Sequence, residues 1–179
     1  KSYRTQDECA GYTFTRAQEP FSSGHNGAVK VYLAEGNDGK KFVWKADRRA
    51  GPSGECSLLN RLGAAGLRGL GCATNCADGL LIEAVMDSYP GKPAMSLKSH
   101  ATKWLQEGED IEPKVDIILP QMLQGLEKMM IAGVLNLDQN WENVLVQTKD
   151  LQITLIDFGV FEATVQEFGS WSAIPNSYK

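Results

Sequence analysis

Residues 134–146 read Val-Leu-Asn-Leu-Asp-Gln-Asn-Trp-Glu-Asn-Val-Leu-Val, and residues 153–159 read Ile-Thr-Leu-Ile-Asp-Phe-Gly. The apolar residues of the two stretches predict two short strands that flank a polar loop. Asp138 lies five residues before Asn143, and Asp157 follows at the end of the second strand.

Two acidic residues and one amide in this order suit phosphoryl transfer. Asn143 and Asp157 offer the oxygen ligands that Mg²⁺ prefers, and Asp138 can accept or orient the proton of an attacking hydroxyl. The structural alternative is a polar loop in which these residues only form turns. Either motif alone arises often by chance, whereas both together at this spacing favour phosphoryl transfer.

A glycine-rich stretch near the N-terminus supports that interpretation. Residues 22–29 read Ser-Ser-Gly-His-Asn-Gly-Ala-Val, and Gly24 and Gly27 let backbone N–H groups approach a polyphosphate closely. Lys45 ends a predicted strand from which it can reach phosphates, and Glu55 opens a predicted helix from which it can pair with Lys45. The structural alternatives are an ordinary turn and a solvated lysine.

The pattern of apolar residues predicts a β-rich first half and a helical second half. Residues 29–34 and 41–45 predict a hairpin around an Asn-Asp-Gly turn, and the leucines after Glu55 predict a helix. Further predicted elements are a strand at 80–86, a helix at 96–107 whose apolar side is Leu97, Ala101, Trp104 and Leu105, and a helix at 113–133 that Pro120 kinks or splits. We therefore predict an α+β fold in which residues 1–88 and 89–179 form the two parts of one domain.

From residue 22 to residue 159 the chain resembles the protein kinases, whose four signature motifs occur here in the same order. The resemblance implies a reduced two-lobed kinase-like fold, with a β-rich N-lobe and a truncated helical C-lobe, and ATP and Mg²⁺ as cofactors. The site residues that it implies are catalytic Asp138, Lys45 and Glu55, metal-binding Asn143 and Asp157, and nucleotide-binding Ser22, Gly24, Gly27, Val29, Lys45, Met86, Asp87 and Tyr89.

Three departures from the kinase pattern narrow the resemblance. Leu137 stands where kinases usually carry the arginine that senses activation-loop phosphorylation, so we expect an enzyme that is active without that switch. Asn140 stands where a lysine near the γ-phosphate is usual. Only 20 residues follow Gly159 in the 179-residue chain, so we expect the helical subdomains that bind peptide substrates to be missing.

A kinase of this size resembles the miniature kinases that pathogenic bacteria inject into host cells by type III secretion. Within that group, the nearest resemblance is to the family that phosphorylates and inactivates the host chaperone HSP90. The resemblance implies a Ser/Thr protein kinase that a bacterium secretes into the host cytosol, with HSP90 as the expected substrate. Two alternatives stay open: a catalytically silent nucleotide-binding module, and a small-molecule kinase of the antibiotic-phosphorylating type.

The composition restricts the other partners. Eighteen basic against 22 acidic residues give a net charge of −4 without a basic run, which argues against nucleic acid and anionic membranes. No apolar stretch approaches the roughly 18 residues of a membrane span, and we expect a monomer. The four cysteines lack the paired spacing of a zinc site, so we expect thiols in preference to metal ligands or disulfides.

Overall fold

The computed structural model describes residues 4–23, 29–47, 55–67, 71–76, 79–89, 91–135, 140–158 and 163–164. Within these ranges the chain is a mixed α+β protein, as the sequence predicts. The chain divides into a first unit, Lys1–Asn60 with Gly69–Ala84, and a second unit, Arg61–Arg68 with Val85–Lys179. The division after Ala84 lies close to the predicted boundary, but the assignment of residues 61–68 to the second unit has no counterpart in the prediction.

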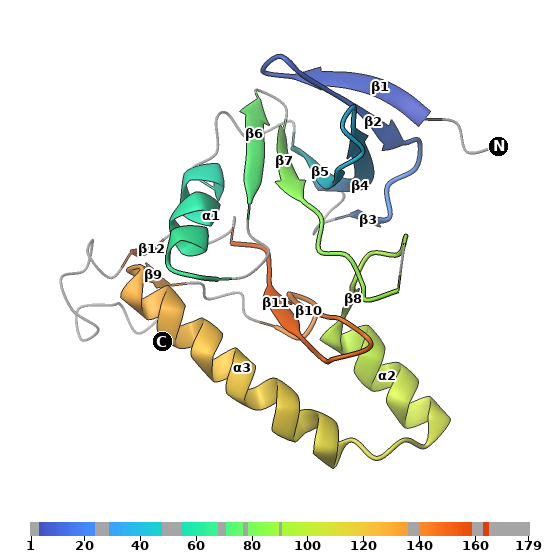
Figure 1. Ribbon diagram of the computed structural model, residues 1–179, viewed down its shortest axis with the longest axis vertical. Coiled ribbons are helices and arrows are strands. Elements are labelled where there is room, and N and C mark those ends of the chain that lie inside the picture. Colours follow the sequence, from blue (N-terminus) through green and yellow to red (C-terminus); the bar gives the residue numbers. More distant parts are fainter. Residues whose placement is uncertain are drawn as a thin grey trace. The chain divides into compact units, whose positions relative to one another are not determined.

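An antiparallel sheet forms the first unit (Figure 1). Its strands follow the order β1-β2-β4-β5-β7-β6, and β3 pairs with β4. The strands are β1 (Arg4–Cys9), β2 (Tyr12–Ala17), β3 (Ser22–Ser23), β4 (Val29–Gly36), β5 (Lys41–Asp47), β6 (Cys72–Cys76) and β7 (Gly79–Glu83). The predicted hairpin is confirmed, because β4 and β5 pair around a turn in which Gly39 adopts a φ of 79°, a conformation that favours glycine.

The two faces of this sheet differ, because side chains alternate along each strand. On one face, Phe42 and Trp44 of β5 belong to a buried cluster that also contains Cys9, Phe14, Tyr32, Ala34 and Leu81. Val43 and Lys45, the alternate residues of β5, belong to the opposite face. The pattern of β5 therefore separates Lys45 from the aromatic cluster.

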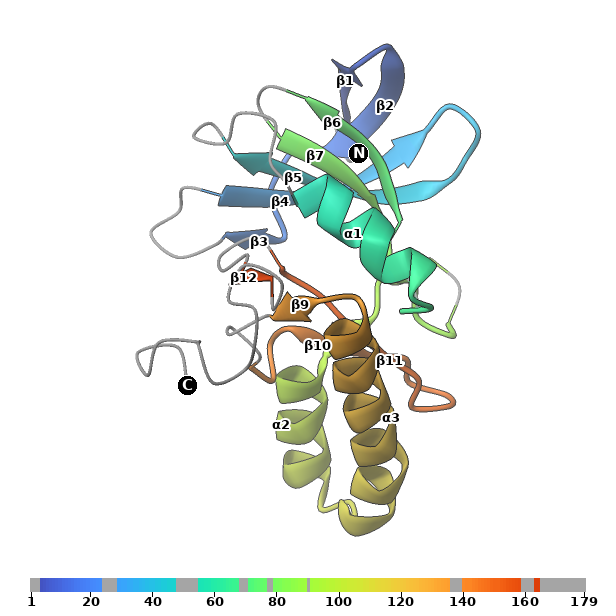
Figure 2. The same cartoon turned by 90° about the vertical axis from the view of Figure 1, so that its left-hand side faces the viewer.

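The helix α1 (Glu55–Ala64) lies on the face that carries Lys45 (Figure 2). Leu58, Leu59 and Leu62 are buried on one side of α1, as predicted. Glu55 falls on the same side, because residues three and four apart share a helical face. The apolar side of α1 thus carries one acidic residue at its first turn.

Disulfides contradict the expectation about the cysteines. Cys56 in the first turn of α1 is bonded to Cys72 at the start of β6, and Cys9 of β1 is also disulfide-bonded. The expectation of thiols is wrong at these positions. The pairing of Cys56 with Cys72 depends on the packing of a helix against a sheet, and the spacing of cysteines in the sequence carries no record of it.

A helical hairpin is the largest feature of the second unit (Figure 2). It consists of α2 (Leu97–Glu107) and α3 (Glu112–Ile131). Ser96 caps α2 by accepting a hydrogen bond from the Ser99 N–H at 3.2 Å, so the predicted helix is confirmed. Its buried side differs from the prediction, because His100 is buried and Leu105 is 68% exposed. No described helix combines the length and apolar character that crossing a membrane requires.

Pro120 does not split α3, which runs without a break from Glu112 to Ile131. Proline removes one backbone donor, and its ring disturbs the carbonyls of the preceding turn. Next to the proline, Gln121 Nε2 donates to the Ile117 carbonyl at 2.9 Å and to the Leu151 carbonyl at 3.0 Å. The Gln121 side chain thus ties this part of α3 to Leu151, just before the strand β11 (Ile153–Leu155).

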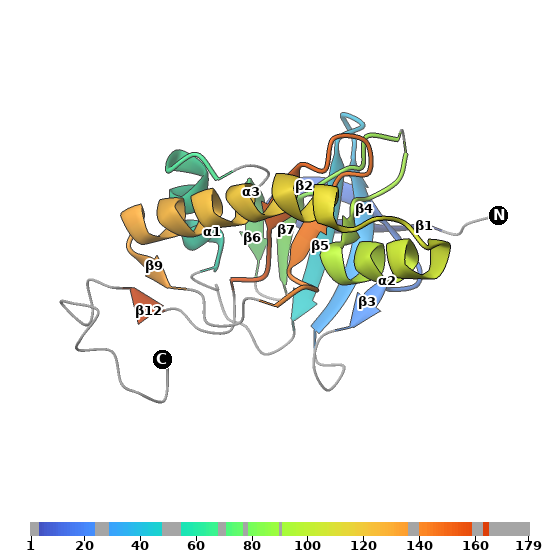
Figure 3. The ribbon, with the colours of Figure 1, turned by 90° about the horizontal axis from the view of Figure 1, so that it is seen from below.

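Short strands complete the second unit. The strands β8 (Met95–Ser96), β10 (Val144–Val146) and β11 (Ile153–Leu155) form one small sheet in the order β11-β10-β8. Beyond the end of α3, β9 (Val134–Leu135) pairs with β12 (Ala163–Thr164) (Figure 3). The helix α3 approaches β11 closely at Gly125, where an added Cβ would lie 2.9 Å from Leu155 Cδ1.

Candidate functional site

In the first unit, Lys45 and Glu55 form a buried ion pair. Lys45 Nζ lies 2.9 Å from Glu55 Oε1 and 3.2 Å from Glu55 Oε2. The two side chains are only 17% and 6% exposed. The predicted pairing is therefore confirmed, across an interval of only ten residues.

The local sequence explains this pair. On β5, Lys45 lies in register between Val31 of β4 and Leu80 of β7, so apolar neighbours flank its stem. Glu55 shares its helical face with the buried leucines of α1. A carboxylate in such surroundings needs a cation, and removing one partner of a buried pair costs about 3–5 kcal/mol. Each residue is therefore required by the other.

In the second unit, Asn143 and Asp157 lie at the same end of the β10–β11 hairpin. Val144 is opposite Leu155 in register, and the Ile156 N–H donates to the Asn143 carbonyl at 2.9 Å. Asn143 is itself buried. The hairpin thus brings together the two residues that the sequence predicts as Mg²⁺ ligands.

Asp157 adopts an unusual backbone conformation. Its φ is 61°, in the left-handed region that costs a residue with a Cβ roughly 1–2 kcal/mol. The neighbouring Phe158 is almost fully buried, as is Leu155 two residues earlier. Buried side chains on both sides hold the backbone in this conformation, and enforced strain of this kind clusters at functional sites.

The donor set of this hairpin end fits Mg²⁺. Asn143 and Asp157 offer amide and carboxylate oxygens, and Mg²⁺ usually binds through one or two carboxylates completed by water and substrate phosphates. Within the described ranges, no cluster of three or more His, Cys, Asp or Glu side chains is arranged to hold a metal ion. Because these two donors leave most of the six positions around Mg²⁺ open, water and substrate phosphates would complete such a site.

Three of the predicted site residues fall outside the described ranges, namely Asp138, Gly24 and Gly27. The residues that frame the glycine-rich stretch are described. Ser22 lies in β3 and is paired with Val31 of β4, the strand that Val29 opens. The stretch is thus bounded on both sides by paired antiparallel strands.

Two main-chain groups of the segment predicted to contact adenine are hydrogen-bonded within the chain. The Asp87 N–H donates to the Lys92 carbonyl at 2.9 Å, and the Met86 carbonyl accepts from Gln147 Nε2 at 2.8 Å. The side chain of Tyr89 is exposed. The Asp87 N–H thus closes a turn within the chain, and the contact of backbone groups near Asp87 and Tyr89 with adenine stays a prediction.

The Asp87 carboxylate fixes this segment to the β10–β11 turn. It accepts hydrogen bonds from the Thr148 N–H at 2.7 Å, the Thr148 hydroxyl at 2.6 Å and the Ser88 N–H at 2.6 Å. Burial works to raise the pKa of Asp87, but these hydrogen bonds outweigh it and hold the pKa below its usual value. Asp87 is therefore a structural anion.

His100 is a structural residue as well. Its Nε2 lies 3.2 Å from the Val146 carbonyl, and its ring centroid lies 5.2 Å from that of Trp104. Burial lowers the pKa of His100, while the Val146 carbonyl and the Asp87 carboxylate act in the opposite direction. The neutral ring joins α2 to β10 by donating a hydrogen bond.

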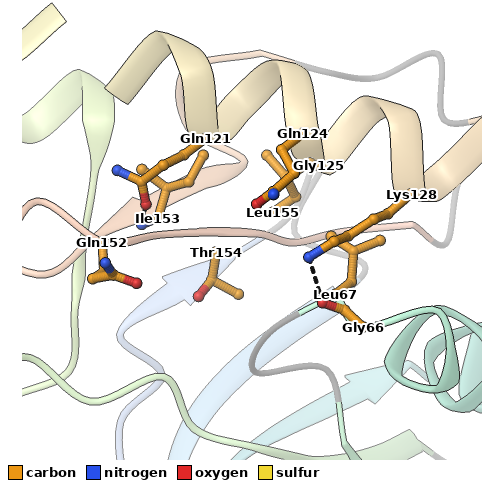
Figure 4. Close-up of a pocket in the computed structure, with 10 residues that line it drawn as sticks. All are labelled: Gly66, Leu67, Gln121, Gln124, Gly125, Lys128, Gln152, Ile153, Thr154 and Leu155. Atoms are coloured by element: carbon orange, nitrogen blue, oxygen red, sulfur yellow. Dashed lines mark hydrogen bonds between the residues drawn. The ribbon is translucent and has the colours of Figure 1, made fainter. Parts of the chain in front are cut away.

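A cavity of about 360 Å³ lies between α3 and β11 (Figure 4). Its lining consists of Gly66, Leu67, Gln121, Gln124, Gly125, Lys128, Gln152, Ile153, Thr154 and Leu155. Lys128 Nζ donates to the Gly66 carbonyl at 3.0 Å, and Gln121 Oε1 accepts from the Ile153 N–H at 3.2 Å. These polar groups join helix, strand and loop, and none of the predicted site residues lines the cavity.

Sequence reasoning misses the residues that hold the predicted ones in place. Cys56 and Cys72 fix the helix that carries Glu55, and the even number of cysteines is the only signal for their pairing. Thr148 binds Asp87 from 61 residues away, and no local pattern announces that contact. Supporting contacts of this kind depend on the tertiary fold.

No protein-family profile matches this chain, and a search of the curated proteins finds no significant match. The function must therefore be argued from the side chains. The lysine of a buried pair can position an anionic group such as a phosphate, and an amide beside a carboxylate can hold a divalent cation.

Proposed function

We propose that the protein is an ATP- and Mg²⁺-dependent Ser/Thr protein kinase with a reduced kinase-like fold. The observation that carries this proposal is the buried Lys45–Glu55 pair. A carboxylate that holds a strand lysine extended gives a fixed cation for nucleotide phosphates. The strained Asp157 beside Asn143 supports the proposal independently, from the other unit.

Each residue has a role in the proposed reaction. Lys45 binds nucleotide phosphates, Asn143 and Asp157 hold the metal ion, and Asp138 orients the attacking hydroxyl. When bound, Mg²⁺ neutralises charge that develops on the transferred group. Because this chemistry depends on positioning and electrostatics, contacts that fix Lys45 and Asp157 matter as much as the groups themselves.

The disulfides bear on where the protein acts. Disulfides persist in oxidising compartments and are rare in the cytosol. The Cys56–Cys72 bond and the bond of Cys9 therefore weigh against action in a host cytosol. Bacterial delivery into host cells and HSP90 as the substrate stay predictions, and we propose the kinase activity independently of them.

Incubation of the full chain with radiolabelled ATP, Mg²⁺ and a eukaryotic lysate tests the proposal. We expect labelled proteins, identified by mass spectrometry, and loss of the label in Asp138→Ala and Asp157→Ala. Asp150→Ala is the matched control, because Asp150 is an exposed residue in the turn at the opposite end of the β10–β11 hairpin. This control should retain full transfer.

Other outcomes assign the protein differently. Nucleotide binding without transfer to any acceptor indicates a silent binding module. ATP consumption that depends on an added aminoglycoside, without labelled protein, indicates a small-molecule kinase. Undiminished protein labelling in Asp157→Ala contradicts the metal-binding role and with it the proposed mechanism.

A further inference from the structure

Two neighbouring residues attach the first turn of α1 to the sheet. Glu55 binds Lys45 of β5 at 2.9 Å, and Cys56 is covalently bonded to Cys72 of β6. Figure 1 shows α1 beside β6, the last strand of the sheet on this side. One turn of helix therefore carries an ionic tie and a covalent tie to two different strands.

The register of the strands gives the spacing of these two ties. Cys72 pairs with Ile82 of β7, and Ile82 pairs with Val43 of β5, so these residues form one row across three strands. Lys45 lies two residues farther along β5, on the same face as Val43. The anchors are thus about 10 Å apart across the sheet and about 7 Å apart along it. Two anchors so far apart prevent α1 from pivoting about either one.

We propose that the Cys56–Cys72 disulfide is a positioning element for Glu55, and that phosphoryl transfer requires this bond to be intact. This inference rests on the proposed function. The helix α1 has only ten residues, a length at which a helix depends on its tertiary contacts. Without the disulfide, the buried leucines keep α1 on the sheet, but of these two ties at its first turn just the Glu55–Lys45 ion pair remains.

A disulfide that merely stabilises the fold is the competing explanation, and Cys9 provides the comparison. Cys9 is also disulfide-bonded, but it lies in the aromatic cluster on the sheet face opposite Lys45. Loss of that bond should lower stability without moving Glu55. Activity measured at a temperature at which all variants are folded distinguishes a disulfide that positions Glu55 from one that only stabilises the fold.

The experiment compares two double variants of the full chain. The first variant, Cys56→Ala with Cys72→Ala, removes the proposed positioning bond. The second variant, Cys9→Ala with Cys76→Ala, replaces the other two of the four cysteines and keeps Cys56 and Cys72. We expect kcat/KM for ATP to fall about tenfold or more in the first variant and to stay within about twofold in the second. Circular dichroism confirms that each protein is folded under the assay conditions.

Reduction provides a second measurement that needs no further substitution. Dithiothreitol transfers two electrons and two protons to the Cys56–Cys72 bond, which leaves two thiols and the cyclic disulfide of the reductant. Applied to the variant that keeps only these two cysteines, it should reproduce the loss, and reoxidation should restore activity. The variant without Cys56 and Cys72 serves as the control for other effects of the reductant.

A double-mutant cycle shows whether the bond acts through Glu55. If it does, removing the disulfide in a Glu55→Gln background lowers kcat/KM by less than about twofold further. A role in fold stability predicts full additivity instead, and additivity overturns the inference. Equal kcat/KM with and without the Cys56–Cys72 bond overturns it as well.

Failure of the proposed function gives a different result. In that case no oxidised protein transfers phosphate, whatever its cysteines. The rate of amide hydrogen exchange in α1 then tests the positioning role without a measurement of activity. Faster exchange on loss of Cys56 and Cys72, but not on loss of Cys9 and Cys76, supports that role, and equal exchange overturns it.

Discussion

Two lysine–glutamate pairs in this chain share their chemistry and differ in their surroundings. Lys45–Glu55 joins β5 to α1, with side chains 17% and 6% exposed. Lys98–Glu142 joins α2 to the residues before β10, with side chains 63% and 62% exposed. Water hydrates both partners of the second pair and salt screens their attraction, whereas neither partner of the first is well hydrated.

The difference shows why the burial of the pair, and not the mere presence of an ion pair, supports the proposed role of Lys45. An exposed pair can be lost with little consequence, because each charge is already solvated. A buried pair ties the geometry of a strand to that of a helix, since neither charge is stable there alone. Removing the same atoms from both pairs should therefore have unequal effects.

Lys45→Ala should have the largest effect. It leaves the Glu55 carboxylate buried without this cation, so we expect the free energy of unfolding to fall by about 3 kcal/mol. We also expect kcat/KM for phosphoryl transfer to fall by at least about a hundredfold. Chemical denaturation and steady-state kinetics measure the two effects. Lys98→Ala is the matched control and should change neither quantity, and unchanged turnover in Lys45→Ala would show that Lys45 has no role in transfer.

Glu55→Gln should have an intermediate effect. The amide keeps the shape of the carboxylate and removes its charge, so the variant stays folded while the ion pair between Lys45 and Glu55 is lost. We expect kcat/KM to fall about tenfold, with Glu142→Gln as the matched control on the exposed pair. A similar loss in both glutamine variants, measured in the same kinetic assay, would remove the distinction between the two pairs.

The sequence predicts the elements of both pairs, because the signals that define them are local. The hairpin of β4 and β5 follows from β-forming residues around Asn-Asp-Gly, and α1 follows from leucines at helical spacing. Lys45 lies near the end of the strand β5 and Glu55 opens the helix α1, so their pairing could be predicted from the pattern.

The sequence predicts less well how a helix is rotated about its axis and which distant residues are in contact. Helical spacing predicts α2 but not its rotation, so it placed Leu105 on the buried side that His100 occupies. The Cys-Ala-Thr-Asn-Cys segment does not alternate between apolar and polar residues, so the sequence does not predict a strand there. In the structure it forms β6, which pairs with β7 and is bonded to α1 by the Cys56–Cys72 disulfide. The hydrogen bonds that Asp87 makes with Lys92 and Thr148 were not predicted either, because no local pattern in the sequence indicates them.

Hydrogen bonds from Thr148 and Ser88, and not an ion pair with a lysine, stabilise the carboxylate of Asp87. Thr148→Val keeps the shape of the side chain and removes the hydroxyl bond, so we expect the free energy of unfolding to fall by about 1 kcal/mol near neutral pH. Thr102→Val is the matched control, because the Thr102 hydroxyl is exposed and donates only to the Lys98 carbonyl within α2.

The pH dependence of this effect has a definite sign. The pKa of Asp87 in the folded protein lies below its ordinary value of 3.8, so the carboxylate contributes stability above that value and loses it as the pH falls through the folded pKa. The difference between Thr148→Val and the unmodified chain should be constant at pH 5–7 and shrink below about pH 4. Denaturant titrations across this range measure it, and a difference that grows on acidification contradicts the assignment.

The smallest effect is expected at the exposed pair. The hydrogen bond and charge of Lys98 hold the pKa of Glu142 below its ordinary value, so Lys98→Ala should raise that pKa, as measured by carboxyl NMR titration. The melting temperature and kcat/KM should stay unchanged, because the main-chain bond from the Lys98 N–H to the Trp141 carbonyl does not involve the side chain. In the unmodified chain, 1 M salt should raise the same pKa, since the Debye length falls there to about 3 Å. A several-fold loss of kcat/KM in Lys98→Ala would instead indicate that Lys98 supplies the positive charge near the γ-phosphate, which kinases usually take from a lysine at the position of Asn140. The exposure of an ion pair would then be a poor guide to its function.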